Sequence, residues 1–193
     1  MKAYREHRED IDNAVKVLRN GGIILYPTDT VWGIGCDATN EDAVGKVNKL
    51  KNQSDKRSML VLIDSDNRLS RYIKEIPEIA WDLIDAADKP LTIIYPGAKN
   101  LAKNLIPIDG TIGIRITKDD FSSTLISKFG KPIVSTSANA AGKKAPSNFS
   151  GISEEIIEGV DYVVNYRQDD YQKNQPSGII RIGLKGEVEI LRH

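Results

Sequence analysis

Cysteine and histidine are nearly absent from this sequence, which contains one cysteine, Cys36, and two histidines, His7 and His193. A single cysteine cannot close a disulfide within the chain, and with two distant histidines it makes no spaced set of zinc ligands. Cys36 is expected to be a small buried side chain, and a histidine-based catalytic triad is not expected. We therefore expect a reducing, cytoplasmic setting and no metal held by protein side chains.

Long apolar runs and an excess of one charge are missing as well. No segment approaches the roughly 18 apolar residues of a membrane span, and the charged N-terminus has no signal-peptide core. We therefore expect a soluble protein without a membrane partner. Lys plus Arg and Asp plus Glu each number 27, so the composition does not indicate a uniformly basic nucleic-acid binder, although a local basic patch stays open.

Helical and strand periodicities are intermixed along the 193 residues, with no long linker or internal repeat. Helices are expected at about 10–20, 43–50, 78–87 and 121–129. Strands are expected at 22–25, 59–63, 91–95, 111–116, 132–135, 162–165, 179–182 and 188–191. This order predicts one α/β domain over residues 1–193, with a mixed, twisted sheet and flanking helices.

Short polar side chains lie at the ends of several expected strands. YPTDTVWG follows the apolar run GIIL, STSAN follows PIV, and PSG precedes IIRI. Ligands of α/β sheets bind where strand ends and their loops converge, so one cavity is expected to be lined by Thr28, Thr30, Ser137, Asn139 and Ser177. The alternative is that these residues form turns and satisfy nearby backbone groups.

Cations occur at two further places of interest. Arg115 lies inside the apolar strand TIGIRI, where a guanidinium is costly unless an anion pairs with it, so it is either an anion clamp or a structural salt bridge. Lys51, Lys56 and Arg57 form either a solvated basic loop or a phosphate site, and no glycine-rich phosphate loop supports the second reading. Without His or Cys chemistry, the sequence favours a reaction between two substrates, such as phosphoryl or nucleotidyl transfer, in which the protein supplies orientation and positive charge.

Several segments in order resemble the YrdC/TsaC family of threonylcarbamoyl-AMP synthases: YPTDTVWGIG (26–35), LK (50–51) ahead of SMLVLI, PLTIIYPG, TIGIRI, KPIVSTSANAAG and PSGIIRI. The resemblance covers nearly the whole chain. It implies a YrdC-like twisted sheet around a large, positively charged, concave cavity. It also implies a reaction in which L-threonine, bicarbonate and ATP, normally with Mg²⁺, give threonylcarbamoyl-AMP and pyrophosphate. Partner proteins would then use the product to modify tRNA.

The resemblance also implies roles for individual residues. Threonine would be bound by Thr28, Thr30, Arg115, Ser137 and Ser177. ATP would be bound by Lys51, Arg57, Thr111, Asn139, Ser147 and Arg192. Catalysis would involve Lys51, Ser137 and Asn139.

Two features follow from the same comparison with the family's pattern. Gly33 and Gly35 are expected to let the chain turn tightly around the cavity, and the polar segment 167–175 is expected to order over it when nucleotide binds. Gln53 stands where the family has a second cation, and Gly178 where it has a hydroxyl. The alternatives are therefore a paralogue without synthase activity and a module that binds tRNA or double-stranded RNA.

Overall fold

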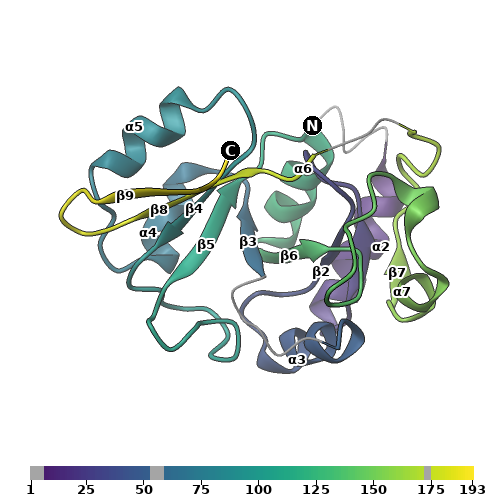
Figure 1. Ribbon diagram of the computed structural model, residues 1–193. Helices are drawn as coiled ribbons and strands as arrows, with labels where there is room; N and C mark the ends of the chain where they lie inside the picture. Colours follow the sequence, from purple (N-terminus) through teal and green to yellow (C-terminus); the bar gives the residue numbers. More distant parts are fainter. Residues whose placement is uncertain (1–6, 53–58, 172–174) are drawn as a thin grey trace.

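The computed structural model describes residues 7–52, 59–171 and 175–193, and these form a mixed sheet flanked by helices (Figure 1). The strands are β1 (Ile24–Tyr26), β2 (Gly33–Gly35), β3 (Leu60–Ile63), β4 (Leu91–Tyr95), β5 (Ile112–Ile116), β6 (Ile133–Ser137), β7 (Tyr162–Val163), β8 (Gly178–Ile182) and β9 (Val188–Arg192). Their order in the sheet is β7-β1-β2-β6-β3-β5-β4-β8-β9. The sheet contains both parallel and antiparallel strand pairs, so the predicted mixed sheet is confirmed.

Strand β6 joins the two halves of this sheet. Its residues 133–135 pair with β3, and Thr136 and Ser137 pair with β2. The β1–β2–β7 group therefore meets the β3–β5–β4–β8–β9 group along one strand, and the two groups are turned relative to each other (Figure 1). This turn makes the sheet concave.

Four of the six described helices lie near the predicted positions, whereas the short helices at 69–72 and 154–158 were not predicted. They are α2 (Arg8–Arg19), α3 (Glu41–Leu50), α4 (Leu69–Tyr72), α5 (Ile79–Ala86), α6 (Asp120–Phe129) and α7 (Glu154–Glu158), with 3₁₀ turns η2 (Asp66–Arg68) and η3 (Phe149–Gly151). Asn40 caps α3 by accepting hydrogen bonds from the amides of Asp42 and Ala43. Gly130 ends α6 in the left-handed conformation, with φ of 83°, as its position in the sequence predicts.

Two apolar clusters hold the helices against the sheet. Helices α2 and α6 pack together through residues such as Ile11, Leu18 and Phe121, and cover Ile24 and Leu62 of the sheet. A second, larger cluster contains the alternate residues of the same strands. It also includes apolar side chains of α3 and of the α4–α5 region. Alternation along β1 and β3 sends successive side chains into the two clusters, which explains why these strands read as continuous apolar runs.

Strand β2 corrects the prediction that Gly33 and Gly35 form a tight turn. Both residues are extended and pair with β1, Gly35 opposite Ile24 and Gly33 opposite Tyr26. A Cβ atom on Gly35 would lie 2.6 Å from Cε1 of Tyr26 and 3.0 Å from Cγ2 of Ile133. Gly35 is therefore required by close packing of the strand against the Tyr26 ring. A three-residue Gly-Ile-Gly strand carries no periodicity that a sequence pattern could reveal.

Candidate functional site

A cavity of about 350 Å³ lies over the concave side of the sheet. Its lining comes from strands β2, β3, β4, β5, β6, β8 and β9 and from the loops beside them. Gly113, in β5, leaves room in the floor because it has no side chain. The cavity is large enough for a small organic ligand.

The structure brings six of the predicted site residues to this cavity: Thr30, Thr111, Arg115, Ser137, Ser177 and Arg192. Four others do not line it, namely Thr28, Lys51, Asn139 and Ser147. Arg57 lies outside the described residues. The predicted convergence of strand ends therefore holds for Thr30, Ser137 and Ser177.

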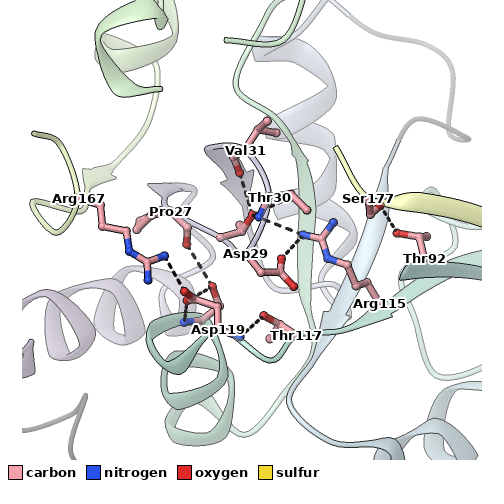
Figure 2. Close-up of polar contacts among 12 residues, drawn as sticks. Pro27, Asp29, Thr30, Val31, Thr92, Arg115, Thr117, Asp119, Arg167 and Ser177 are labelled. Atoms are coloured by element: carbon pink, nitrogen blue, oxygen red, sulfur yellow. Dashed lines mark hydrogen bonds and ion pairs between the residues drawn. The ribbon is translucent and has the colours of Figure 1, made fainter. Parts of the chain in front are cut away.

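Arg115 is the most deeply buried charge at the cavity, with a residue exposure of 3%. Its Nη2 lies 3.0 Å from Oδ1 of Asp29, and Figure 2 shows the guanidinium pointing toward that carboxylate and the Thr28–Thr30 turn. The Nε of Arg115 is buried and has no hydrogen-bond partner among the described residues. Arg115 therefore forms the structural salt bridge of one sequence alternative, and its Nε is still an unused donor.

Asp29 was missed by the sequence analysis. Burial raises the pKa of its carboxyl, while the positive charge of Arg115 acts in the opposite direction. Asp29 lies within the YPTDT segment, between the two threonines that the analysis did select. An acidic residue flanked by candidate ligand residues was the available signal, since a buried arginine needs a counter-ion.

The two threonines of this segment have different surroundings. Oγ1 of Thr28 accepts a hydrogen bond from the Thr30 amide at 3.0 Å and donates to the Val31 carbonyl at 2.8 Å (Figure 2). Thr28 is therefore the turn former that the alternative interpretation predicted. Its hydroxyl also lies 3.0 Å from that of Thr30, which lines the cavity.

Ser177, directly before β8, and Thr92, on the neighbouring strand β4, form a second pair of hydroxyls. Their oxygens are 2.8 Å apart, and Ser177 is 2% exposed (Figure 2). Thr92 lines the cavity but was not predicted, although it is the one polar residue of the apolar strand LTIIY that could have signalled it. The Ser177 carbonyl accepts a hydrogen bond of 2.7 Å from Nε of Arg192, which fixes that arginine over the cavity.

The end of β6 presents Ser135, Thr136 and Ser137 to the cavity. The Lys51 ammonium does not line the cavity, but it donates a hydrogen bond to the carbonyl of Ser137, which does. Burial lowers the pKa of Lys51 to about 8. Lys51 is thus coupled to the cavity through Ser137.

Asn139 differs from its prediction, because β6 ends at Ser137 and the strand alternation does not extend to it. Its amide nitrogen donates to the carbonyls of Ala140, at 3.0 Å, and Lys143, at 2.7 Å. Asn139 therefore holds the loop that follows β6, and it does not line the cavity.

Among the described residues, the charged side chains that line the cavity are all arginines: Arg115, Arg181 and Arg192. Burial lowers the pKa of Arg192, and the positive charge of Arg115 lowers it further. An anion bound beside Arg192 would offset the cost of placing its guanidinium near another positive charge. The cavity is therefore suited to a ligand with more than one anionic group.

Arg167, at the start of the segment 167–175, is tied to helix α6. Its Nη1 donates to Oδ2 of Asp119 at 2.6 Å, while Oδ1 of Asp119 caps α6 by accepting from the Ser122 amide (Figure 2). The expected ordering of this segment over the cavity involves residues 172–174, which lie outside the described residues.

The described residues contain no group of three or more His, Cys, Asp and Glu side chains that could hold a metal ion. None of their helices combines the length and apolar character that crossing a membrane requires.

The fold and the cavity define an α/β protein whose sheet carries a cavity lined by arginine guanidinium groups and short hydroxyl side chains. The family described as "Telomere recombination" (Sua5, YciO, YrdC) matches residues 16–193, and the chain belongs to this family. The predicted family and its fold are thereby confirmed.

Individual relatives extend this finding. A threonylcarbamoyl-AMP synthase of Pseudoalteromonas translucida is 32% identical over 178 residues, which cover 91% of this chain and 94% of the relative. A variant of P. abyssi Sua5 superposes with a TM-score of 0.84 at 26% identity, covering 97% of this chain and 55% of that one. P. abyssi Sua5 complexed with L-threonine gives a TM-score of 0.79 at 25% identity, covering 89% of this chain and 50% of that one. The chain thus spans about half the length of these Sua5 structures.

Proposed function

We propose that this protein is a threonylcarbamoyl-AMP synthase, which converts L-threonine, bicarbonate and ATP into threonylcarbamoyl-AMP and pyrophosphate. The similarity to a synthase of that name along 91% of the chain supports this, as does the similarity to a Sua5 complexed with L-threonine. The observation that carries the proposal is that Thr30, Arg115, Ser137 and Ser177 line one cavity together with Thr111 and Arg192.

Threonine binding is assigned to the Arg115 side of the cavity. The buried Nε of Arg115 is an unused donor while Nη2 faces Asp29, so a substrate carboxylate can accept a hydrogen bond from Nε. Thr30, Ser137 and Ser177 then supply short hydroxyl groups for the amine and the side-chain hydroxyl of threonine. Thr28 contributes by holding Thr30 in place.

The chemistry needs no nucleophile from the protein. The threonine amine combines with bicarbonate to form a carbamate with loss of water, and a carbamate oxygen attacks the α-phosphorus of ATP. A phosphorus–oxygen bond to the carbamate forms, the bond from the α-phosphorus to the bridging oxygen breaks, and pyrophosphate leaves. The protein orients the reactants and offsets the charge that develops on the phosphate.

Nucleotide binding is assigned to Thr111 and Arg192 at the cavity, with Arg57 outside the described residues. For Lys51 and Asn139 we propose positioning roles, Lys51 through the Ser137 carbonyl and Asn139 through the loop that it holds. Mg²⁺ would enter with the triphosphate, since nucleotide phosphates and water usually complete its coordination. In the cytoplasm, tRNA-modifying partner proteins would consume the product.

The test is pyrophosphate release by the purified protein with ATP, bicarbonate and Mg²⁺, comparing L-threonine, L-serine and no amino acid. We expect release that depends on threonine. Folded protein that binds ATP without threonine-dependent release would favour the paralogue. Salt-sensitive RNA binding without such release would favour the RNA-binding module.

A further inference from the structure

Among the described arginines of the cavity, Arg181 is the one that the proposed function leaves without a role. It lies on β8, and Ser177, directly before this strand, lines the cavity at alternate positions with Ile179 and Arg181. Strand pairing places Thr92 of β4 beside Ile179 and Ile94 beside Arg181. Thr92 also pairs with Arg115 of β5. Arg181 therefore lies two strands away from Arg115 and is displaced from it along the strand direction by two residues.

The contacts of Arg181 leave most of its hydrogen-bonding capacity unused. Its Nη1 lies 3.4 Å from Oε2 of Glu189 on β9, in a pair whose side chains are 41% and 60% exposed. An ion pair with side chains this exposed and with this long a nitrogen–oxygen distance contributes little to stability. The Nε of Arg181 is buried and has no hydrogen-bond partner among the described residues. A buried guanidinium nitrogen without an acceptor is costly, and an anion in the cavity would remove that cost.

Arg192 lies on the neighbouring strand β9 and lines the same end of the cavity. It pairs with Ile179 across β8 and β9, so it lies next to the row of Ser177, Ile179 and Arg181. Its Nε is used by the Ser177 carbonyl, which leaves the two terminal nitrogens of its guanidinium for a ligand. No acidic residue lines the cavity among the described residues.

We propose that Arg181 and Arg192 form a phosphate subsite at the β8–β9 end of the cavity, in which Arg181 binds a phosphate group of ATP and Glu189 holds Arg181 when the subsite is empty. This inference rests on the proposed function and adds Arg181 to its nucleotide-binding residues. The planar, forked guanidinium suits phosphate oxygens, and the weak Glu189 pair is readily exchanged for a doubly charged phosphate.

The experiment measures the dissociation constant of ATP, without threonine, by calorimetry at several salt concentrations. Arg181→Met removes the charge and keeps an apolar stem of similar length. We expect ATP to bind about tenfold more weakly to this variant, and its affinity to depend less on salt. Glu189→Gln removes the competing carboxylate, so this variant is expected to bind ATP about two- to threefold more tightly.

Lys185→Met is the matched control, because it removes one positive charge from the exposed turn of the same hairpin, outside the cavity. We expect its ATP affinity to equal that of the wild type. If Arg181→Met binds ATP as tightly as wild type, or more weakly with an unchanged salt dependence, the subsite is wrong while the proposed function stands. If the folded wild type does not bind ATP, both proposals fail.

Discussion

Arg115 shows what a single buried charge can determine. The sequence predicted it as an anion clamp or a salt bridge because a cation inside an apolar strand needs a partner. The structure pairs it with Asp29 and leaves its Nε unused. Asp29 was missed as the partner because it comes from a distant loop, about which the periodicity of the strand contains no information.

The first prediction concerns Arg115→Ala. It removes the proposed partner of the threonine carboxylate, so we expect threonine binding to weaken by about 2–4 kcal/mol, measured by calorimetry. The same change leaves Asp29 buried without its counter-ion, so the free energy of unfolding should fall by about 3–5 kcal/mol in urea denaturation.

The double variant Asp29→Asn with Arg115→Ala separates the two effects. Removing both charges should restore part of the lost stability, because no uncompensated carboxylate is left, while threonine binding stays weak. Normal threonine affinity in the double variant would rule out the assigned role of Arg115.

The second prediction concerns Lys51 and pH. Its pKa is lowered to about 8 by burial, so the ammonium is charged below that pH and loses its charge as the pH rises through it. If this charge supports nucleotide binding, ATP affinity should fall by about tenfold between about pH 7 and about pH 9. In Lys51→Met this fall should disappear. Calorimetric titrations with ATP at each pH check this, and a flat profile for the wild type would contradict it.

At the scale of elements, glycine has opposite effects in strand β2 and in helix α3. Gly35→Ala places a methyl group 2.6 Å from the Tyr26 ring and 3.1 Å from the Val134 carbonyl, between paired strands that cannot move apart freely. We expect it to lower the free energy of unfolding by about 1–3 kcal/mol.

Gly45→Ala is the matched control for this third prediction. Gly45 lies inside α3, and the nearest atom to an added Cβ, Nδ2 of Asn104, is 4.0 Å away. Here alanine should raise the free energy of unfolding by about 0.5–1 kcal/mol, because it favours the helix and meets no neighbour. Urea denaturation of both variants tests whether the two changes in the free energy of unfolding have opposite signs. Equal changes would contradict the packing argument.

The elements themselves were predicted where the sequence carries a strong local pattern. Helix α6 has an apolar face, an Asp119 cap and a Gly130 stop, and it begins and ends close to the predicted positions. Strand β2 and helices α4 and α7 were missed because they have three, four and five residues, which is too short for a period to show.

At the scale of the whole molecule, ligands that bind only the folded chain must stabilise it. ATP or threonine at about 100 times its dissociation constant adds about 2.7 kcal/mol, which for a chain of this size raises the melting temperature by about 5–10 °C. We expect ATP and L-threonine each to produce a shift in thermal denaturation, and L-serine a smaller one.

The Asp29→Asn, Arg115→Ala double variant serves as the control for this fourth prediction. It should keep the shift with ATP and lose the shift with threonine, because the proposed nucleotide residues Thr111 and Arg192 are intact. A threonine shift equal to that of the wild type would show that threonine binds elsewhere.

The sequence by itself determined the α/β class, most helices and strands, the family, and six of the predicted residues that line the cavity, since periodicity, caps and ordered motifs are local properties of the chain. Only the tertiary structure decided which polar strand ends reach that cavity. Thr30, Ser137 and Ser177 do, whereas Thr28 and Asn139 satisfy backbone groups nearby. It also brought Asp29 to Arg115 and Arg181 to the cavity. The physical reason is that side-chain direction depends on strand register and on partners far apart in sequence, which are fixed only when the sheet assembles.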